Sequence, residues 1–475
     1  MQINNDITGI EEFYNGIANR RDFWKRKASY YHQQLTRLFT FTIPQGQKVI
    51  EIGCGTGDLL AALKPSRGVG VDISESMIKI AKKKFPKLNF VKGQAEHLEL
   101  QDTFDFIVLS DIVGNLVDAQ EAFKELHKIA DENTRIIINY HNYLWEPILA
   151  FAERIGFKMP QPIQSWLSKE DIENLLGLSN FEVIKSSTFL LLPVYIPLLS
   201  YIINKYIARL PLINKLCLVR YFIVRKMPDI SSDKSYSVSV IIPARNEEGN
   251  IEKAATNIPM LGKSTELIFV EGHSRDGTKK EIKRIIKKYK NSRSLMLVDQ
   301  GRGIGKADAV RKGIEKATGE IIMIFDADLT VDPKELHKFY EAIRTKKSEY
   351  IHGSRLVYPM EKEAMRFLNV LGNKFFSSAF TFLLDQRIKD TLCGTKVFFR
   401  KNYKKIAKNR SYFGDFDPFG DFDLIFGASK LNLKIMEIPI RYKARAYGTT
   451  NISRFRHGLL LLKMTILAAR KIKFF

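Results

Sequence analysis

Two aspartates, Asp326 and Asp328, follow a run of five apolar residues at 321–325. Such a run predicts a buried strand, which delivers both carboxylates at the point where it leaves its sheet. Hard divalent cations take oxygen ligands, and a bound diphosphate supplies the oxygens that the protein does not. A cation held here would neutralise the charge that develops on a nucleoside-diphosphate leaving group. The spacing therefore predicts that Asp326 and Asp328 hold Mg2+ or Mn2+ beside a nucleotide.

Three glycines, Gly53, Gly55 and Gly57, alternate between an apolar run and a helical pattern, with Glu51 just before them. Glycine is needed where the backbone turns sharply and a ligand approaches it closely. Asp72 ends the next apolar run, and a carboxylate in that place can accept hydrogen bonds from both hydroxyls of a ribose. These residues predict a second nucleotide-like site in the first half of the chain.

Both groups lie in segments where short apolar runs alternate with helical patterns, which predicts an α/β fold with two doubly wound, mostly parallel sheets. Further strands are expected at 181–191 and 216–225, with helical spacing at 198–212 between them. The polar, proline-containing stretch after Met227 indicates a linker. We expect a helical segment at 1–43, a first domain at 44–228, a linker at 229–236, and a second domain at 237–475 that ends in an amphipathic helix.

The composition limits the classes of partner. The 475 residues carry a formal net charge of +23, which is typical of a lysine-rich surface and also of proteins that meet anionic substrates or membranes. No nucleic acid is expected, because the basic residues form no aromatic-plus-basic recognition motif. Three separated cysteines without a C-x-x-C pair predict neither zinc nor disulfides and favour a cytoplasmic location. No signal peptide is expected, and the apolar run at 189–203 is too short to span a bilayer.

The glycine loop resembles the first motif of class I S-adenosylmethionine-dependent methyltransferases, E/D-x-G-x-G-x-G, and the resemblance covers residues 20–228. It implies a seven-stranded Rossmann-like sheet with S-adenosylmethionine as cofactor. The glycines would face its methionine part, Asp72 its ribose, and the segment Gly93-Gln94-Ala95-Glu96 its adenine, although that family often has Asp where this chain has Gln94. The implied cofactor-binding residues are Glu51, Gly53, Gly55, Gly57, Asp72, Gln94 and Ala95.

The methyl acceptor cannot be identified from the sequence. A hydroxyl acceptor would need a base, and Asp111 and His141 lie at predicted strand ends where a base is expected. His141 is equally consistent with a structural histidine. The first domain is alternatively a non-catalytic module that binds the cofactor or anchors the second domain.

Three motifs of the second half resemble glycosyltransferase family two, a GT-A fold that uses nucleotide-sugar donors, over residues 238–460. They are the strand ending at 243–248, the segment 269–278, and the helix start at 305–313. The implied nucleotide-sugar-binding residues are Pro243, Ala244, Glu247, Glu271, Asp276, Lys306 and Asp326.

The downstream motifs, at 353–355, 390–396, 437–439 and 448–453, resemble the dolichol-phosphate mannosyltransferase-like branch of that family. This resemblance implies inverting transfer to a polyprenyl phosphate and, besides the two aspartates, phosphate-binding roles for Arg355, Arg366 and Arg445, since guanidinium groups match phosphate oxygens. Two departures are evident. Thr330 stands where the branch usually has Gln, and its transmembrane hairpins are absent.

A soluble glycan or a small alcohol is the alternative acceptor, and it would need a base such as Asp417, Asp421 or Asp423. Apolar residues at 375–384 and 459–467, the latter bordered by basic residues, favour peripheral binding to the inner face of the cell membrane. The alternative is that these residues pack on the domain core or form a dimer contact.

Overall fold

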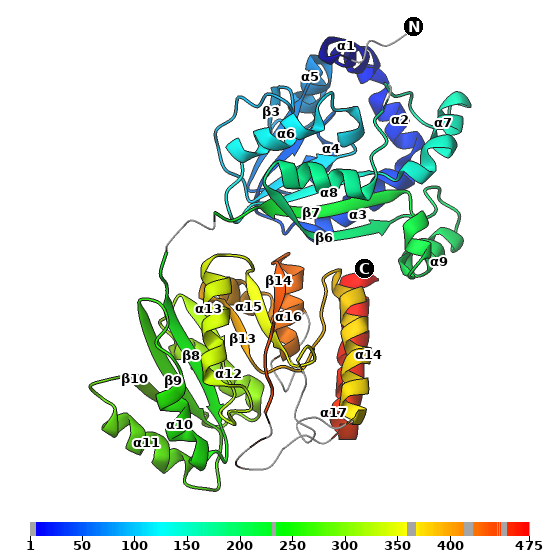
Figure 1. The fold of residues 1–475 in the computed structure, drawn as a ribbon. Helices are drawn as coiled ribbons and strands as arrows, with labels where there is room; N and C mark the ends of the chain where they lie inside the picture. Colours follow the sequence, from blue (N-terminus) through cyan, green and yellow to red (C-terminus); the bar gives the residue numbers. More distant parts are fainter. Residues whose placement is uncertain are drawn as a thin grey trace. The chain divides into compact units, whose positions relative to one another are not determined.

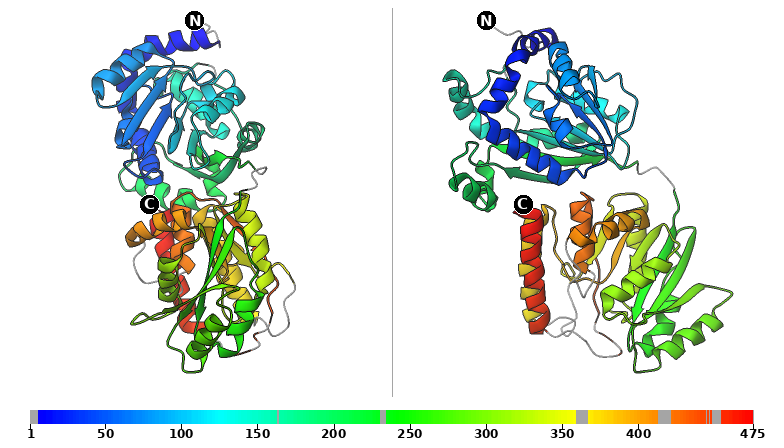
Figure 2. Two further views of the ribbon diagram at one scale, coloured as in Figure 1. Left: turned by 90° about the vertical axis from the view of Figure 1, so that its left-hand side faces the viewer. Right: turned by 180° about the vertical axis from the view of Figure 1, so that it is seen from behind.

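A computed structural model describes residues 6–162, 164–229, 234–358, 367–412, 421–443, 445, 447 and 454–474, without the side chains of 367–371, 411, 421 and 454–457. The chain divides into two compact units, Met1–Met227 and Pro228–Lys473, with Phe474 grouped with the first unit and Phe475 with the second. Each unit is built on its own seven-stranded sheet, with helices on both faces (Figures 1 and 2). The expected α/β class with two sheets is confirmed.

The sheet of the first unit has the strand order β3-β2-β1-β4-β5-β7-β6. The strands from β3 to β5 are parallel, whereas β7 pairs antiparallel with both β5 and β6. Buried apolar residues lie on both faces of the parallel strands, which is why these segments are continuous apolar runs. The elements are α1 (Ile7–Ile17), α2 (Arg21–Lys27), α3 (Ser29–Thr42), β1 (Lys48–Ile52), α4 (Asp58–Ala62), β2 (Arg67–Asp72), α5 (Glu75–Lys84), β3 (Asn89–Lys92), β4 (Phe106–Ser110), α6 (Ala119–Glu125), β5 (Arg135–His141), α7 (Glu146–Arg154), α8 (Lys169–Leu178), β6 (Phe181–Phe189), α9 (Leu199–Lys205) and β7 (Val219–Lys226).

The sheet of the second unit has the order β10-β9-β8-β11-β13-β12-β14. Strands β8 to β11 are parallel, β13 is antiparallel to both its neighbours, and β14 is parallel to β12. The elements are β8 (Ser237–Ala244), α10 (Glu248–Asn257), β9 (Ser264–Glu271), α11 (Thr278–Lys288), β10 (Ser294–Asp299), α12 (Lys306–Lys316), β11 (Ile321–Ile324), α13 (Leu336–Arg344), β12 (Tyr350–Ser354), α14 (Phe367–Leu384), β13 (Lys396–Phe399), α15 (Arg400–Lys408), α16 (Asp421–Lys430), β14 (Ile435–Pro439) and α17 (Arg454–Ala468).

The strand order reverses next to β1 in the first sheet and next to β8 in the second. In open α/β sheets, ligands bind at the carboxyl ends of the strands where the order reverses. The glycine loop follows β1, and Asp326 follows β11, which pairs with β8. The topology therefore positions both predicted groups of residues at switch points.

The segment 198–212 is not the continuous helix that its spacing predicts. Helix α9 ends at Lys205, and a short 3-10 turn, Ile207–Arg209, follows. Leu212 has a φ of 72°, which is incompatible with a right-handed helix. Two polar residues of the segment, Asn204 and Arg209, point inward, so its spacing reflects buried polar contacts rather than an apolar face.

Candidate functional sites

The loop between β1 and α4 turns on three glycines that all have left-handed backbone, with φ values of 75°, 52° and 77° at Gly53, Gly55 and Gly57. A Cβ at Gly53 would lie 2.6 Å from Cδ1 of Ile112, and one at Gly57 would lie 2.6 Å from the ring of Phe90. A Cβ at Gly55 would meet nothing within 4 Å. Packing and backbone together therefore require glycine at Gly53 and Gly57, whereas Gly55 borders open space.

Two acidic side chains support this loop. Asp72 accepts hydrogen bonds from the backbone N–H of Gly55 at 2.7 Å and of Ser74 at 2.9 Å. Burial raises the pKa of Asp72, and these two donors oppose the rise. Glu51 accepts from the N–H of Leu60 at 3.0 Å, and burial raises its pKa to about 8, so its carboxyl is protonated at neutral pH. Glu51 thus braces the start of α4, and Asp72 fixes the loop.

A cavity of about 540 Å³ lies against the glycine loop. Its volume is within the range of roughly 300–1,000 Å³ that is usual for small-molecule sites. Of the predicted cofactor-binding residues, two do not line it, namely Gly57 and Gln94. Those that do are Glu51, Gly53, Gly55, Asp72 and Ala95.

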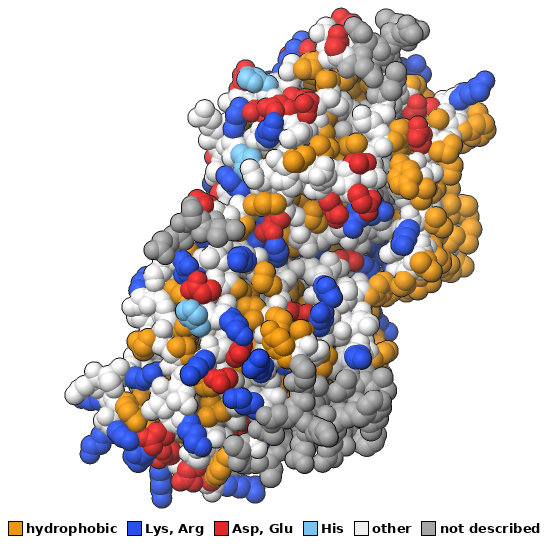
Figure 3. Space-filling view, viewed as in Figure 1, with side chains coloured by type: hydrophobic (Ala, Val, Ile, Leu, Met, Phe, Trp, Pro, Cys, Tyr) orange, Lys and Arg blue, Asp and Glu red, His pale blue; other side chains and the backbone are white. Residues whose placement is uncertain are grey.

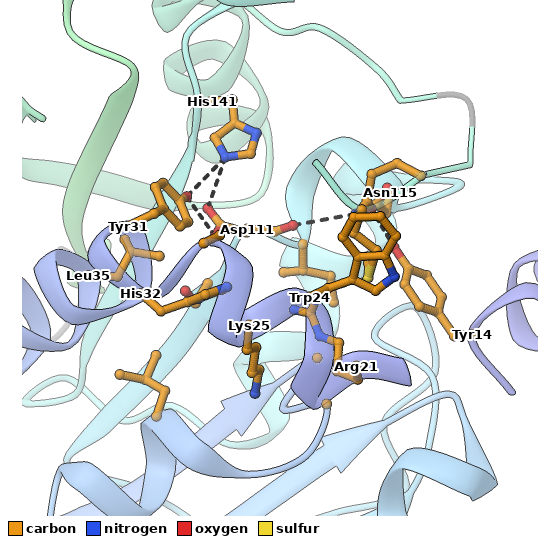
Figure 4. Close-up of a pocket in the computed structure, with 18 of the residues that line it drawn as sticks. Tyr14, Arg21, Trp24, Lys25, Tyr31, His32, Leu35, Asp111, Asn115 and His141 are labelled. Atoms are coloured by element: carbon orange, nitrogen blue, oxygen red, sulfur yellow. Dashed lines mark hydrogen bonds and ion pairs between the residues drawn. The ribbon is translucent and has the colours of Figure 1, made fainter. Parts of the chain in front are cut away.

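The N-terminal helices form another wall of the cavity, as Figure 4 shows. They contribute Tyr14, Arg21, Trp24, Lys25 and Tyr31, for which the sequence alone indicates no role. Lys25 donates to Oγ1 of Thr56 at 2.9 Å, which ties α2 to the glycine loop. The interleaved aromatic and basic residues of this segment are the signal that marks it. Such a pattern is also usual for a solvated helix, so it identifies the cavity wall only once the fold is known.

Asp111 and His141, at the ends of β4 and β5, meet Tyr31 in the cavity wall (Figure 4). The Tyr31 hydroxyl donates to Oδ2 of Asp111 at 2.8 Å and lies 2.9 Å from Nε2 of His141. Asn139 donates to the other oxygen of Asp111. Burial lowers the pKa of His141, although the charge of Asp111 opposes this, so the imidazole is neutral at physiological pH. A neutral imidazole beside a hydroxyl and a carboxylate can accept a proton from a bound molecule.

Replacing Asp72 by Ala is expected to weaken S-adenosylmethionine binding by about 1.5–3 kcal/mol, the scale of a charge-assisted hydrogen bond. The carboxylate both anchors the loop and reaches the cavity, so its loss removes a ligand contact and a loop support. Calorimetry measures the affinity, with Asp102→Ala as the matched control because Asp102 pairs with Arg67 and does not line the cavity. Unchanged affinity in Asp72→Ala would remove the assignment.

In the second unit, a cluster of opposite charges surrounds the end of β11. Nζ of Lys306, the first residue of α12, lies 2.6 Å from Oδ1 of Asp326. Arg445 lies 2.7 Å from Oδ2 of Asp328 and 3.1 Å from Oε1 of Glu247, which follows β8. Burial pushes the pKa of Asp326 upward, but the positive charge of Lys306 prevails and holds it below the ordinary value. The site therefore alternates carboxylates and cations, an arrangement suited to a phosphate-bearing ligand.

The loop that precedes β13 approaches Asp326 closely. A Cβ at Gly394 would lie 1.9 Å from Oδ2 of Asp326 and 2.8 Å from Nζ of Lys306. Any side chain here would displace the carboxylate, so glycine is required by the approach of the backbone. The charges of Lys396 and Arg355 also help to lower the pKa of Asp326.

The other residues that the sequence predicts to bind the nucleotide-sugar lie at or just after the ends of neighbouring strands. Pro243 and Ala244 close β8, and Glu271 closes β9 and accepts from the N–H of Ser274 at 2.6 Å. Asp276 accepts from the N–H of Thr278 at 3.0 Å and from the hydroxyl of Tyr447 at 3.4 Å. Since Arg445 and Tyr447 belong to one segment, that segment contacts the loops after β8, β9 and β11.

Arg355 lies in a buried ion pair. Its guanidinium donates to both oxygens of Asp390, at 2.7 and 2.8 Å, and Asn373 donates to the same carboxylate at 2.9 Å. Glu437 accepts from the N–H groups of Lys389 and Asp390. Arg355 therefore organises the loop that carries Gly394, besides its expected role toward phosphate. Arg366, Asp417 and the motif at 448–453 lie outside the described residues, as does the side chain of Asp421.

The carboxylate oxygens of Asp326 and Asp328 fit a divalent cation only together with oxygens from a bound ligand. Asp328 accepts from the hydroxyl of Thr330 at 2.8 Å as well as from Arg445, so Thr330 steadies a carboxylate in the place where the related branch has Gln. Within the described ranges, no group of three or more His, Cys, Asp or Glu side chains is arranged to hold a metal ion. Two carboxylates that are completed by diphosphate oxygens remain consistent with the preferences of Mg2+ and Mn2+.

The apolar residues of α14 and α17 are divided between the core and the surface. Phe380 and Leu383 are buried, whereas Phe375 and Leu459 remain exposed. Helices α14 and α17 pack against each other (Figure 1). Across the part of the chain that the structure describes, we find no helix with the length and apolar character needed to cross a bilayer.

Comparisons with known proteins give matches for both units. Residues 23–186 match the family model described as a methyltransferase domain, and residues 239–407 match glycosyl transferase family 2. The first part of the chain is 24% identical over 196 residues to the ubiquinone/menaquinone biosynthesis C-methyltransferase UbiE of Campylobacter jejuni, an alignment that covers 35% of this chain and 81% of that enzyme.

Two relatives match the second part. The dolichol-phosphate mannosyltransferase of Saccharomyces cerevisiae is 34% identical over 114 residues, which cover 23% of this chain and 42% of that enzyme. The dolichyl-phosphate beta-glucosyltransferase ALG5A of Trichomonas vaginalis is 27% identical over 233 residues, which cover 45% of this chain and 68% of that enzyme.

Proposed function

We propose that this chain, an enzyme that joins a methyltransferase domain to a family 2 glycosyltransferase domain, catalyses both transfers. The glycosyltransferase domain would transfer a sugar from a nucleotide-sugar to a polyprenyl phosphate with inversion. The methyltransferase domain would methylate an acceptor that is not yet identified. The cluster formed by Lys306, Asp326, Asp328 and Arg445 is the observation that carries the first activity.

In the glycosyltransferase site, the chain's own residues supply charges of both signs where the nucleotide-sugar would bind. Asp326 and Asp328 would hold Mg2+ or Mn2+ together with the diphosphate, and the cation, when bound, neutralises charge on the leaving group. Lys306 and Arg445 lie within hydrogen-bond distance of these carboxylates. When a ligand binds, the two cationic side chains can turn from the carboxylates to its phosphate oxygens. The lowered pKa of Asp326 keeps its carboxylate ionised for this role.

A polyprenyl phosphate is the acceptor that we favour over a soluble glycan or alcohol. The names of two relatives specify dolichol phosphate. A phosphate monoester, whose second pKa is about 6, is ionised near neutral pH and needs no base, whereas an alcohol does. Asp423, one of the three carboxylates that could act as that base, accepts a hydrogen bond from Arg410 at 2.9 Å. A carboxylate engaged by a guanidinium is a poor proton acceptor, which supports the phosphate.

In the methyltransferase site, S-adenosylmethionine supplies an electrophilic methyl group when bound, so the chain must hold the acceptor and take its proton. The cavity beside Gly55 and the Asp72 carboxylate fit such a cofactor. We propose that His141 accepts the acceptor's proton, with its ring oriented by Tyr31, which is itself held by Asp111. The alternative, a module that binds without transferring, predicts cofactor affinity but no product.

Replacing His141 by Gln is expected to lower methyl transfer about 10²–10⁴-fold, the usual contribution of a general base. Because burial lowers the pKa of His141, its neutral form persists as the pH falls below 6.5, so the wild-type rate should decline only at still lower pH. The assay follows label from S-adenosylmethionine into a lipid extract, with exposed His97→Gln as the control. A His141→Gln enzyme with an unchanged rate and pH profile would exclude this base.

We also propose that the enzyme acts at the inner, cytoplasmic face of the cell membrane as a peripheral protein. The support is its net charge of +23 together with the exposed apolar residues. Release by high salt is expected, because screening removes the electrostatic attraction to anionic lipids.

A further inference from the structure

The first unit exposes a broad apolar surface, formed by residues 148–157 of α7 and its following turn and by residues 194–216 around α9. Its most exposed members are Leu198 and Leu212, each 73% exposed, Tyr195 at 68%, Phe157 at 67% and Phe151 at 62%. In the space-filling view of Figure 3, hydrophobic side chains gather over the elements that Figure 1 labels α7 and α9. Contiguous exposed apolar surface of this kind marks an interaction site.

Helix α9 buries polar side chains and exposes apolar ones, the reverse of a helix whose outer side faces water. Ser200 is fully buried, where it donates to the carbonyl of Val194 at 2.8 Å and accepts from the N–H of Ile196 at 2.7 Å. Asn204 is also buried and donates to the carbonyl of Leu192 at 2.8 Å. Tyr201, between them, is 49% exposed. A helix that faces water buries its apolar side, so this orientation fits apolar surroundings.

The backbone holds the two most exposed leucines outward. Leu198 has a φ of 62° with a ψ of −46°, and Leu212 has a φ of 72° with a ψ of −51°. Bulky residues rarely adopt a positive φ. Backbone of this kind persists where the surrounding structure imposes it, and it concentrates at functional sites. The surrounding structure therefore imposes the exposure of these two leucines.

The charge of this surface indicates which kind of partner binds it. The segment 194–216 has no Asp or Glu, and it carries Lys205 and Lys215 besides the buried Arg209. Nζ of Lys205 lies 5.0 Å from the ring centroid of Tyr201 and 5.8 Å from that of Tyr206, so a positive charge accompanies the exposed aromatic rings. The part of the surface around α9 combines apolar side chains with tyrosines and lysines and has no acidic residue, which matches the interface of an anionic bilayer. The one acidic residue of the α7 part, Glu153, is paired with Lys158.

The methyltransferase cavity is continuous with the same surface. Val194 and Tyr195 belong to both, as does Phe157, and Leu149 of α7 also lines the cavity. A molecule dissolved in the bilayer would therefore reach the cavity without crossing water.

We propose that the surface formed by 148–157 and 194–216 binds the anionic face of a lipid bilayer and opens the methyltransferase cavity toward it. The inference rests on the proposed peripheral location and assigns that location to the first unit rather than to α14 and α17. It does not depend on which acceptor either domain uses, because binding is measured without turnover.

The experiment is co-sedimentation of the full chain with vesicles of phosphatidylcholine alone or with phosphatidylglycerol added. The test variant is Leu198→Asn with Leu212→Asn, because asparagine is polar and close to leucine in size, and circular dichroism checks that the variant is folded. The matched control is Phe375→Ser with Leu459→Ser, which removes exposed apolar residues from α14 and α17. A third variant, Lys205→Glu with Lys215→Glu, tests the charge.

We expect wild-type protein to bind anionic vesicles at low salt. The leucine variant and the lysine variant should each bind at least about tenfold more weakly than wild type, and the control should bind like wild type. If the control loses binding and the leucine variant keeps it, the surface assignment is wrong and the peripheral location stands. If wild-type protein does not bind anionic vesicles, the surface assignment and the peripheral location are both wrong. Light scattering would then test whether the leucine variant disrupts a dimer formed through this surface.

Discussion

Asp326→Asn and Asp328→Asn are each expected to lower glycosyl transfer by at least about 10²–10³-fold, the cost of removing one preorganised electrostatic group from an active site. Asparagine keeps the size of the side chain but loses the charge that pairs with Lys306 or Arg445 and that would hold the cation. Turnover with a labelled nucleotide-sugar measures the effect, and thermal unfolding shows that stability changes far less than activity.

Asp332→Asn is the control, because Asp332 follows the same strand but pairs with Lys443 on the surface. Excess chelator should abolish turnover of the wild-type enzyme, and added Mg2+ or Mn2+ should restore it. Full activity in excess chelator would exclude a metal-bridged donor. Wild-type turnover in Asp326→Asn would exclude the site itself.

Asp390→Ala is expected to lower the free energy of unfolding of the second unit by about 3–5 kcal/mol, the cost of leaving one partner of a buried ion pair uncompensated. Asp390 is buried, and its loss leaves the Arg355 guanidinium without either of its carboxylate contacts. The loop that carries Gly394 to Asp326 would lose its anchor, so activity should fall with stability.

The pH dependence follows from the pKa of Asp390. Burial pushes this pKa up, but the charge of Arg355 and the hydrogen bonds prevail and hold it well below its ordinary value of 3.8. A depressed pKa contributes stability that is fully present above pH 3.8 and is lost as the pH falls through the folded-state pKa. The deficit of Asp390→Ala should therefore be constant near neutral pH and shrink only in acid.

Denaturant unfolding followed by circular dichroism measures both units. Trp fluorescence reports the first unit alone, because all three tryptophans, at 24, 145 and 166, lie there. That signal is the internal control and should not move. A second unit that is equally stable in Asp390→Ala and wild type would show that the ion pair is dispensable.

The sequence predicts the parts of the two sites that depend on local pattern. Apolar runs followed by glycines or aspartates mark strand ends, and parallel strands bring such ends together, so the fold class and the position of Asp326 followed from spacing. Both family resemblances, to methyltransferases and to family two glycosyltransferases, are confirmed by the family models.

The contacts that complete the sites depend on tertiary packing and could not be predicted. Arg445 pairs with Glu247 across 198 positions of sequence, and Tyr31 meets His141 across 110. Likewise, the apolar surface around α9 could not be distinguished from a buried helix, because exposure depends on which side of the segment faces the core.

We propose above all that the second domain transfers a sugar to a lipid phosphate. Its most direct test incubates the full chain with polyprenyl phosphate and a panel of nucleotide-sugars and reads the lipid by mass spectrometry. We expect one donor to add the mass of a single sugar to the polyprenyl phosphate, in a metal-dependent reaction that Asp326→Asn abolishes. Unmodified polyprenyl phosphate, together with an Asp326-dependent transfer to a water-soluble glycan, would contradict it.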